Sequence, residues 1–366
     1  MTSTTRLPLQ GLTVLALEQA VAAPFCTSRL ADAGARVIKI ERPGGDFARG
    51  YDDVAKGQSS YFVWLNRGKE SLVLDVQTPE GKARLAELIG AADVLMQNLK
   101  PGALERLGFP VPELRRRHPR LIVCSITGYG DRGPLAERKA YDLLVQAESG
   151  LCSITGGPDE PSRVGISIVD IATGATAQAA ILEALVARSI TGEGADIRIS
   201  MFDVMADWLT VPLLNHEGGK SPKRIGMAHP SISPYGVFTT SDGVQVLISI
   251  QSDREWATLC RHFLGDTGPV TDPRFATNVA RVRNRPETDG MVARMFASLD
   301  CATAEALLIK ADIAFARVND MEGLSRHPHL RRISVETPNG PVACPAPATI
   351  FVDASREYGP VPALED

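Results

Sequence analysis

Short apolar runs alternate with amphipathic, helix-like segments through the first 130 residues of the chain. The first run, LTVLALE at 12–18, is followed by a helix-like segment at 24–34 and a second run, RVIKIERP, at 36–43. Gly34 stands where the end of a helix favours glycine, and Pro43 ends the second strand. Strand, helix and strand within about thirty residues predict a βαβ unit, which is the building block of a parallel sheet.

The same alternation continues to residue 130. Helix 78–92 is predicted from its capping threonine, its early proline and its apolar stripe. Three further strands are predicted, at 71–76, 93–99 and 121–130. We therefore expect an α/β fold whose large domain is a Rossmann-like open parallel sheet, with ligands bound beyond the carboxyl ends of its strands.

The chain from 141 to about 202 reads as helical, and 171–194 is its strongest predicted helix. Just before and at the start of this helix, the stretch RVGISIVDIATG at 163–174 has the pattern of a buried strand that Asp170 interrupts. Asp170 has two interpretations, which the local pattern leaves open. It can cap the following helix by accepting backbone N–H bonds, or it can be a carboxylate nucleophile that the helix start keeps ionised.

A second region begins near residue 225. The stretch 234–250 predicts a hairpin with Asp-Gly at its turn, and helices are predicted at 253–265 and 303–313. We expect three parts up to residue 330: a large domain over 1–202, a linker over 203–224 and a smaller α+β domain over 225–330.

Composition narrows the class of protein. The 366 residues are 44% hydrophobic and 22% charged with a net charge of -4, which is typical of a soluble globular protein and gives no support for a nucleic-acid partner. The six cysteines are scattered and the six histidines lack a metal-ligand spacing, so we expect reduced thiols and no metal. The N-terminus lacks the apolar core of a signal peptide, and no run of about 18 apolar residues appears, so we expect a cytoplasmic protein with no membrane partner.

Candidate chemistry from the residues alone is limited. Arg42, at the end of the second strand, can meet a phosphate. Arg67, Lys69 and Lys100 either hold a polyphosphate at the sheet edge or are ordinary solvated loop residues. The chain has neither a dinucleotide fingerprint nor a serine nucleophile elbow. Among the histidines, His229 is the best candidate for a functional residue, and an ordinary loop histidine is the alternative interpretation.

The chain resembles the class III (formyl-CoA transferase-like) CoA-transferase family across nearly its whole length. The matches lie in one order along the chain and include APFCTSRLADAGARVIKIERPGGDFAR at 23–49, NRGKESLVLDVQTPEGKA at 66–83, ADVLMQNLKPGALERLGF at 92–109, YDLLVQAESGL at 141–151 and DIATG at 170–174. The resemblance implies that Asp170 is a covalent nucleophile, which takes the acyl group as a mixed anhydride and then carries CoA as an aspartyl thioester. Coenzyme A and acyl-CoA would be substrates, with no permanently bound cofactor.

The resemblance also implies the contacts of CoA and of the acids. The expected CoA-binding residues are Val21, Ala22, Arg42, Leu74, Val76, Asn98, Leu99, Arg106 and Lys139. The chain departs from the family at Val21, where relatives have glutamine, and at Gln77, where they have lysine. Arg49 and Arg163 are candidate partners of a second substrate carboxylate, and Tyr141 and His229 are the other candidate substrate contacts.

The family implies an interlocked homodimer, with 331–366 returning to the large domain and small carboxylic acids as the other partners. The glycine run of oxalate-specific members is missing, and the stretch around 46–75 is similar to members that act on C4–C5 dicarboxylates. We therefore expect transfer of CoA, with succinyl-CoA as donor, to an acceptor such as itaconate, mesaconate or citramalate. A 2-methylacyl-CoA racemase is disfavoured because Tyr141 stands where those enzymes have their histidine base. A non-catalytic acyl-CoA-binding protein is the third interpretation.

Overall fold

The computed structural model describes residues 7–352 and 356–364, which form two compact units. Unit 1 comprises the described residues within 1–151, 163–213 and 331–366, and unit 2 comprises 152–162 and 214–330. These boundaries differ from the predicted ones at two places. Residues 203–213, predicted as linker, belong to unit 1, and 152–162, predicted as large domain, belong to unit 2.

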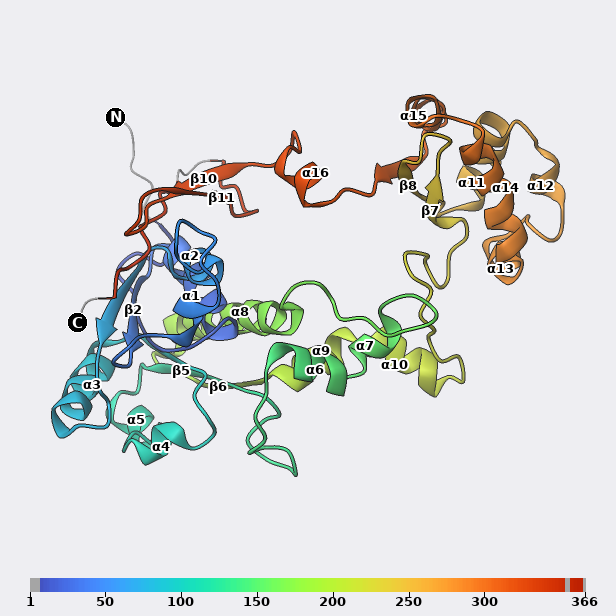
Figure 1. Ribbon diagram of the computed structural model, residues 1–366. Coiled ribbons are helices and arrows are strands. Elements are labelled where there is room, and N and C mark those ends of the chain that lie inside the picture. The colour runs from blue at the N-terminus through green and yellow to red at the C-terminus, as the bar shows by residue number, and fades with distance from the viewer. Residues whose placement is uncertain (1–6, 353–355, 365–366) are drawn as a thin grey trace. The chain divides into compact units, whose positions relative to one another are not determined.

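Unit 1 is built on a six-stranded parallel sheet, which confirms the predicted α/β fold (Figure 1). The strand order is β3-β2-β1-β4-β5-β6, so the order reverses between β1 and β4, where such sheets open a crevice for ligands. The bounds are β1 Thr13–Leu17, β2 Arg36–Glu41, β3 Lys69–Val73, β4 Val94–Gln97, β5 Ile122–Thr127 and β6 Asp196–Ser200. The sixth strand is one that the sequence pattern missed, because it lies inside the region predicted as helical.

Helices cover both faces of the sheet, and the alternation of side chains along each strand supplies both cores. On one face Val14 and Ala16 pack with α1 (Ala22–Asp32) and α8 (Ile168–Thr191). On the other face Leu15 and Leu17 pack with α3 (Pro79–Ala91), α4 (Ala103–Arg106) and α5 (Val111–Arg117). Figure 1 shows α1 and α8 together on the first face and α3 on the second.

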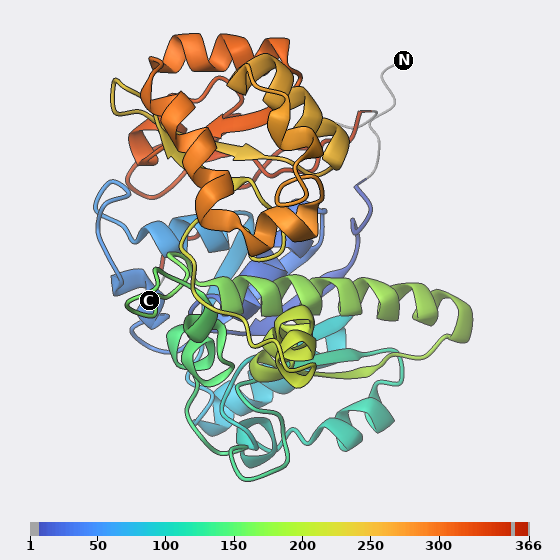
Figure 2. The ribbon, with the colours of Figure 1, turned by 90° about the vertical axis from the view of Figure 1, so that its right-hand side faces the viewer.

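Helix α8 is the longest element, and it runs the length of unit 1 in Figure 2. Its end is fixed by Gly192, whose φ of 79° is a left-handed conformation that glycine adopts without strain. By length and composition α8 is apolar enough to cross a membrane, which the sequence reading did not predict. It packs here against α1, β5 and β6 with part of its surface buried.

The other elements of unit 1 are shorter. The buried strand suggested by the pattern at 163–174 is absent: the backbone is irregular over 163–167, α8 begins at Ile168, and Ile166 is 54% exposed. An alternation of apolar residues forms a strand only where a neighbouring strand pairs with it, and the described residues offer none at this place. The remaining elements are η1 Phe47–Gly50, α2 Ser60–Asn66, α6 Asp142–Glu148, α7 Leu151–Ile154, α9 Met201–Trp208, α10 Thr210–Glu217, β10 Arg332–Val335 and β11 Val342–Pro345, of which α7 and α10 run into unit 2.

Unit 2 contains a three-stranded antiparallel sheet, β7-β8-β9, covered by helices. The predicted hairpin is present, with Asp242 and Gly243 at its turn. Its core is aromatic, with Trp256, Phe263 and Phe296 buried. The bounds are β7 Tyr235–Thr239, β8 Gln245–Ser249, α11 Asp253–Leu259, η2 Cys260–Leu264, α12 Gly268–Thr271, α13 Asn278–Arg283, α14 Arg285–Ala297, α15 Cys301–Lys310, β9 Ala314–Arg317 and α16 Met321–Ser325.

Candidate functional site

Asp170 lies in the first turn of α8, and its carboxylate does not cap that helix. The cap is supplied by Asp142, whose Oδ1 accepts the backbone N–H of Val169 at 2.8 Å and of Asp170 at 3.1 Å. The prediction that Asp170 is the N-cap is therefore wrong. The donors that a first-turn acid normally attracts are occupied by a carboxylate from another helix.

Asp142 is itself held in place by α6. Its Oδ2 accepts a hydrogen bond from the Nε2 of Gln146 at 2.7 Å, and the Oε1 of Gln146 accepts the backbone N–H of Val164 at 2.9 Å. Gln146 is fully buried. One turn of α6 thus fixes both the start of α8 and the irregular segment before it, which gives Asp170 a rigid base.

Burial is the main electrostatic influence on Asp170. It raises the pKa of the Asp170 carboxyl to about 7, and the negative charge of Asp142 adds to the effect. Among the described residues, none forms a hydrogen bond with the half-buried side chain of Asp170 to stabilise its charge. The helix start therefore does not keep the carboxyl fully ionised, as the local pattern had suggested. A carboxylate of this basicity is a better nucleophile than an ordinary aspartate and is still partly ionised near neutral pH.

Tyr51 lies near Asp170. Burial raises the pKa of Tyr51 to about 12, and Asp46, Asp170, Tyr141 and Tyr61 raise it further by proximity. The rings of Tyr51 and Tyr61 meet edge to face at 5.5 Å. The phenol of Tyr51 therefore stays neutral around pH 7 and can donate a hydrogen bond. Of the three tyrosines, the sequence pattern singled out only Tyr141.

The turn between β1 and α1 forms another wall of the site. Val21, Phe25 and Leu65 form a buried cluster against which Ile171, the neighbour of Asp170, packs. A Cβ added at Gly174 would lie 2.4 Å from the carbonyl oxygen of Ala22, so glycine is required for the close approach of α8 to this turn. Of the expected CoA-binding residues, Val21 and Ala22 are thus brought next to the nucleophile candidate.

The other expected CoA-binding residues lie at the carboxyl end of the sheet or in the loops beyond it. Leu74, Val76 and Leu99 are half-buried and pack against one cluster on the second face of the sheet. The cations Arg42, Arg106 and Lys139 are exposed, as a phosphate site requires. Asn98 differs from these, because both ends of its side chain bind the backbone of Gln19.

The two arginines proposed for a second carboxylate stand in different environments. The guanidinium of Arg49 forms two hydrogen bonds with buried Glu41, at 2.7 and 2.9 Å, and lies 3.7 Å from the ring centre of Phe62. A substrate carboxylate would have to displace Glu41 from it. Arg163 is exposed and lies seven positions before Asp170 in the chain.

Arg67 and Lys69 are not surface cations. Arg67 is buried and donates to Asp32 at 3.0 Å, and the Nζ of Lys69 donates to Glu18 at 2.7 Å. Burial lowers the pKa of Lys69 to about 8. Both readings of these residues from the sequence, a polyphosphate site and a solvated loop, are therefore wrong.

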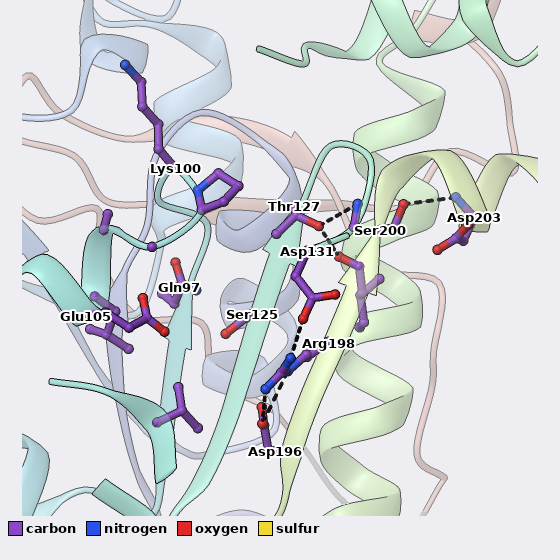
Figure 3. Close-up of a pocket in the computed structure, with 17 residues that line it drawn as sticks. Gln97, Lys100, Glu105, Ser125, Thr127, Asp131, Asp196, Arg198, Ser200 and Asp203 are labelled. Atoms are coloured by element: carbon purple, nitrogen blue, oxygen red, sulfur yellow. Dashed lines mark hydrogen bonds and ion pairs between the residues drawn. The ribbon is translucent and has the colours of Figure 1, made fainter. Parts of the chain in front are cut away.

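A separate pocket of about 260 Å³ is lined by residues of β4, β5 and β6 and of the loops that follow β4 and β5 (Figure 3). Its cations are Lys100 and Arg198, and Arg198 is paired with Asp131 and Asp196, as the dashed lines in Figure 3 show. Glu105 and Asp203 add further acids to the lining. The excess of acids makes this pocket unfavourable for a polyphosphate.

His229 lies in unit 2 with its ring fixed on both sides. Its Nδ1 accepts the backbone N–H of Ser231 at 3.1 Å, and the ring stacks on Tyr235 at a centroid distance of 5.1 Å. An Nδ1 that accepts leaves the proton of the neutral ring on Nε2. His229 is thereby a donor of defined direction within unit 2.

The missed residues, Asp142, Tyr51 and Tyr61, share one property. Each lies more than 25 positions from Asp170 along the chain, and the family matches around them did not mark them as site residues. The alternation pattern carries no signal for such residues, since their importance comes from tertiary proximity. A useful signal was the acid directly after Tyr141 at the predicted start of a helix, because acids there often cap helix ends.

Comparison with known proteins supplies the context for this site. The family model described as CoA-transferase family III matches residues 9–361. A succinate–glutarate CoA-transferase of Agrobacterium fabrum is 40% identical over 78% of this chain and 74% of that protein. An acetyl-CoA:oxalate CoA-transferase of Acetobacter aceti is 38% identical over 92% of this chain and 87% of that protein.

A solved structure agrees with the fold. The crystal structure of a CAIB/BAIF family protein from Brucella suis superposes with a TM-score of 0.81 and 36% sequence identity, and covers 96% of this chain and 95% of that one. The similarity therefore extends over both units.

Proposed function

The chain belongs to CoA-transferase family III, and we propose that it transfers CoA from succinyl-CoA to a carboxylic acid through a covalent intermediate on Asp170. The observation that carries the proposal is the Asp170 carboxyl itself. It lies half-buried at the start of α8, with a pKa of about 7, beside the turn that holds Val21 and Ala22. No metal or permanently bound cofactor takes part in the proposed reaction.

The proposed steps balance without an external energy source. An Asp170 oxygen attacks the thioester carbonyl of the donor, the C–S bond breaks, and CoA thiolate leaves a mixed anhydride behind. The thiolate then attacks the aspartyl carbonyl, which releases the donor as a free carboxylate and leaves an aspartyl-CoA thioester. The acceptor carboxylate attacks this thioester, and the thiolate finally takes the acceptor acyl group and frees Asp170. Covalent catalysis thus divides one difficult exchange into four displacement steps.

The surroundings of Asp170 support these roles. The apolar side chains of Val169 and Ile171 flank the nucleophile and limit the access of water to an anhydride. Tyr51, whose pKa is raised to about 12, is a neutral donor that can stabilise the oxyanion of each tetrahedral intermediate, and the hydroxyl of Tyr141 is a second donor near it. Leu74, Val76 and Leu99 offer an apolar surface for adenine, and Arg42, Arg106 and Lys139 offer charge for the phosphates.

We propose a C4–C5 dicarboxylate as the acceptor. The 40% identical relative is named for succinate and glutarate, which are C4 and C5 dicarboxylates, whereas the 38% identical one is named for oxalate. We assign the second carboxylate to Arg163, which is exposed and lies seven positions before Asp170 in the chain. Arg163→Gln should raise the KM for a dicarboxylate by about tenfold and leave that for acetate unchanged. An equal effect on both acids would remove Arg163 from the acceptor site.

We also propose that the chain acts as a homodimer in the cytoplasm. Apolar side chains lie exposed along one stripe of α8, at Leu182, Val186 and Ile190, with Val186 and Ile190 more than half exposed (64% and 82%). A second copy of the chain would cover such a face. The interlocked arrangement follows from the family resemblance. A sizing measurement that found a stable monomer would contradict it.

The test of the proposed function is a panel assay. The protein is incubated with succinyl-CoA and with glutarate, mesaconate, itaconate, citramalate or oxalate, and the CoA esters are read by mass spectrometry. Transfer is expected with wild type and not with Asp170→Ala, while Asp207→Ala on the exposed end of α9 serves as the matched carboxylate control. Transfer that survives in Asp170→Ala would remove the nucleophile.

The two alternatives predict other outcomes of the same panel. A racemase would incorporate solvent deuterium at the α-carbon of a 2-methylacyl-CoA with no acceptor present. A non-catalytic protein would bind CoA esters without turnover. Tyr141, whose side chain lacks the basic nitrogen of histidine, is the observation against the racemase.

A further inference from the structure

The turn between β1 and α1 has a strained backbone. Ala20 has a φ of 62°, a left-handed conformation that an alanine adopts only when its surroundings impose it. The turn leads directly into the start of α1, where Val21 and Ala22 pack against α8. Something must hold Ala20 in this conformation, and the surrounding hydrogen bonds identify it.

Asn98, which follows β4, binds the turn from one side. Its Oδ1 accepts the backbone N–H of Gln19 at 2.9 Å, and its Nδ2 donates to the carbonyl oxygen of the same residue at 2.9 Å. Both functional groups of the amide thereby bind one residue of the turn, which fixes the orientation of the Asn98 side chain relative to Gln19.

A buried ion pair binds the turn from the other side. The Nζ of Lys39 donates to Asp46 at 2.8 Å and to the carbonyl oxygen of Glu18 at 3.3 Å. The other oxygen of Asp46 accepts the N–H of Ala20 at 3.4 Å and that of Ala48 at 3.0 Å. Lys39 is fully buried and Asp46 nearly so, so water does not compete for the hydrogen bonds of this pair.

The backbone of the turn is therefore held by side chains at four successive polar groups. The carbonyl of Glu18, the N–H and carbonyl of Gln19, and the N–H of Ala20 all have partners outside the turn. These bonds resist relaxation of Ala20 to a right-handed conformation. Since Gly174 allows α8 to approach Ala22 closely, the shape of the turn is transmitted to the wall beside Asp170.

We infer that Asn98 is a positioning residue of the transfer reaction, which acts through the turn at 18–21 together with Lys39 and Asp46. The inference rests on the proposed function of Asp170. The family resemblance gives Asn98 a different role, as a CoA contact. A distorted turn would misplace the acyl group relative to the nucleophile after binding, and such a defect appears in kcat more than in KM.

The experiment separates positioning from binding. Asn98→Ala should lower kcat for CoA transfer by about tenfold or more and leave the KM and the measured Kd for succinyl-CoA within about twofold of wild type. Arg106→Ala is the contrasting variant, because loss of a phosphate contact should raise KM and leave kcat nearly unchanged. A rise in KM for Asn98→Ala at unchanged kcat would overturn the inference and make Asn98 a CoA ligand.

A rescue variant tests the turn directly. Glycine adopts a positive φ without strain, so Ala20→Gly in the Asn98→Ala background should restore the left-handed turn and recover kcat by about threefold or more. A double variant no faster than Asn98→Ala would overturn the mechanism. Asn98→Asp, which keeps the size and the Oδ1 acceptor and loses the donor to Gln19, provides the same comparison if the alanine variant does not fold.

The outcomes also distinguish this inference from the proposed function. If wild type transfers no CoA to any acid, or if Asp170→Ala remains active, the proposed function fails whatever Asn98 does. If Asp170→Ala is inactive and Asn98→Ala is as fast as wild type, the proposed function stands and the positioning role fails.

Discussion

Asp170 should reduce the stability of the folded protein, and Asp170→Asn should therefore stabilise it. The carboxyl has a pKa of about 7 in the folded state against an ordinary value of 3.8. A carboxyl with a raised folded-state pKa stays protonated between those values while the unfolded chain is already ionised. The free energy of unfolding therefore falls as pH rises from about 4 to about 7, and is constant above that window as far as this group is concerned.

The size of the effect follows from the two pKa values. The full difference between the two pKa values lowers the free energy of unfolding by about 4 kcal/mol at pH 8, and solvent around the half-buried side chain reduces this to about 2 kcal/mol. At pH 5 the gap is only partly expressed, which leaves about 1 kcal/mol. Asparagine has the same shape and no charge, so it removes the ionisation penalty without leaving a cavity.

The assay is thermal unfolding at pH 5 and pH 8. Asp170→Asn should raise Tm by about 2–4 °C at pH 8 and by about half as much at pH 5. Asp207→Asn, an exposed carboxylate on α9, is the matched control and should show no such dependence on pH. A variant that is no more stable than wild type at pH 8, or a gain that does not shrink at pH 5, would refute the electrostatic account of the site.

Two further predictions concern the surroundings of Asp170. Asp142→Asn keeps the Oδ1 acceptor for the start of α8 and removes the like charge, so the pKa of Asp170 should fall. The acid limb of the kcat/KM profile, measured from pH 5 to 9, should then move to lower pH. An unmoved limb would exclude Asp142 as a cause of the raised pKa of Asp170. Gly174→Ala would force a Cβ to within 2.4 Å of the carbonyl oxygen of Ala22 and should lower the free energy of unfolding, measured in urea, by about 2 kcal/mol or more. Gly290→Ala in α14 is the control and should be neutral or stabilising, because the added Cβ would contact only the flexible side chain of an arginine. Equal effects of the two substitutions would show that α8 does not need the close approach.

The layered fold of unit 1 could be predicted because it depends on local patterns. Apolar strands followed by capped helices repeat along the chain, and Thr78 does cap α3 by accepting the N–H of Gly81 at 3.0 Å, as its position suggested. The edge strand β6 was missed because Asp196 and Arg198 interrupt its apolar positions. An edge strand has one partner and one solvated side, so its pattern is weaker than that of a central strand.

The site was predictable only in part, and the reason is the distance along the chain between its members. The sequence located Asp170, and it located Val21 and Ala22 through the family resemblance. It could not locate Asp142, because the cap of α8 comes from 28 positions away. It also failed to predict the structure of 163–174, where residues 163–167 form an irregular segment held by Gln146 and α8 begins at Ile168.

The buried charges around the first turn follow from the same physics. Burial by itself would raise the pKa of Glu18, but Lys69 and Lys39 outweigh it and hold the pKa below its usual value. Removing one partner of such a buried group leaves an uncompensated charge and is strongly destabilising. The Nζ of Lys39 donates to the carbonyl oxygen of Glu18 and to Asp46, and Asp46 in turn accepts the N–H of Ala20. Lys69, which the sequence suggested as a phosphate or loop cation, belongs to this group through Glu18, inside the protein and next to the turn against which α8 packs.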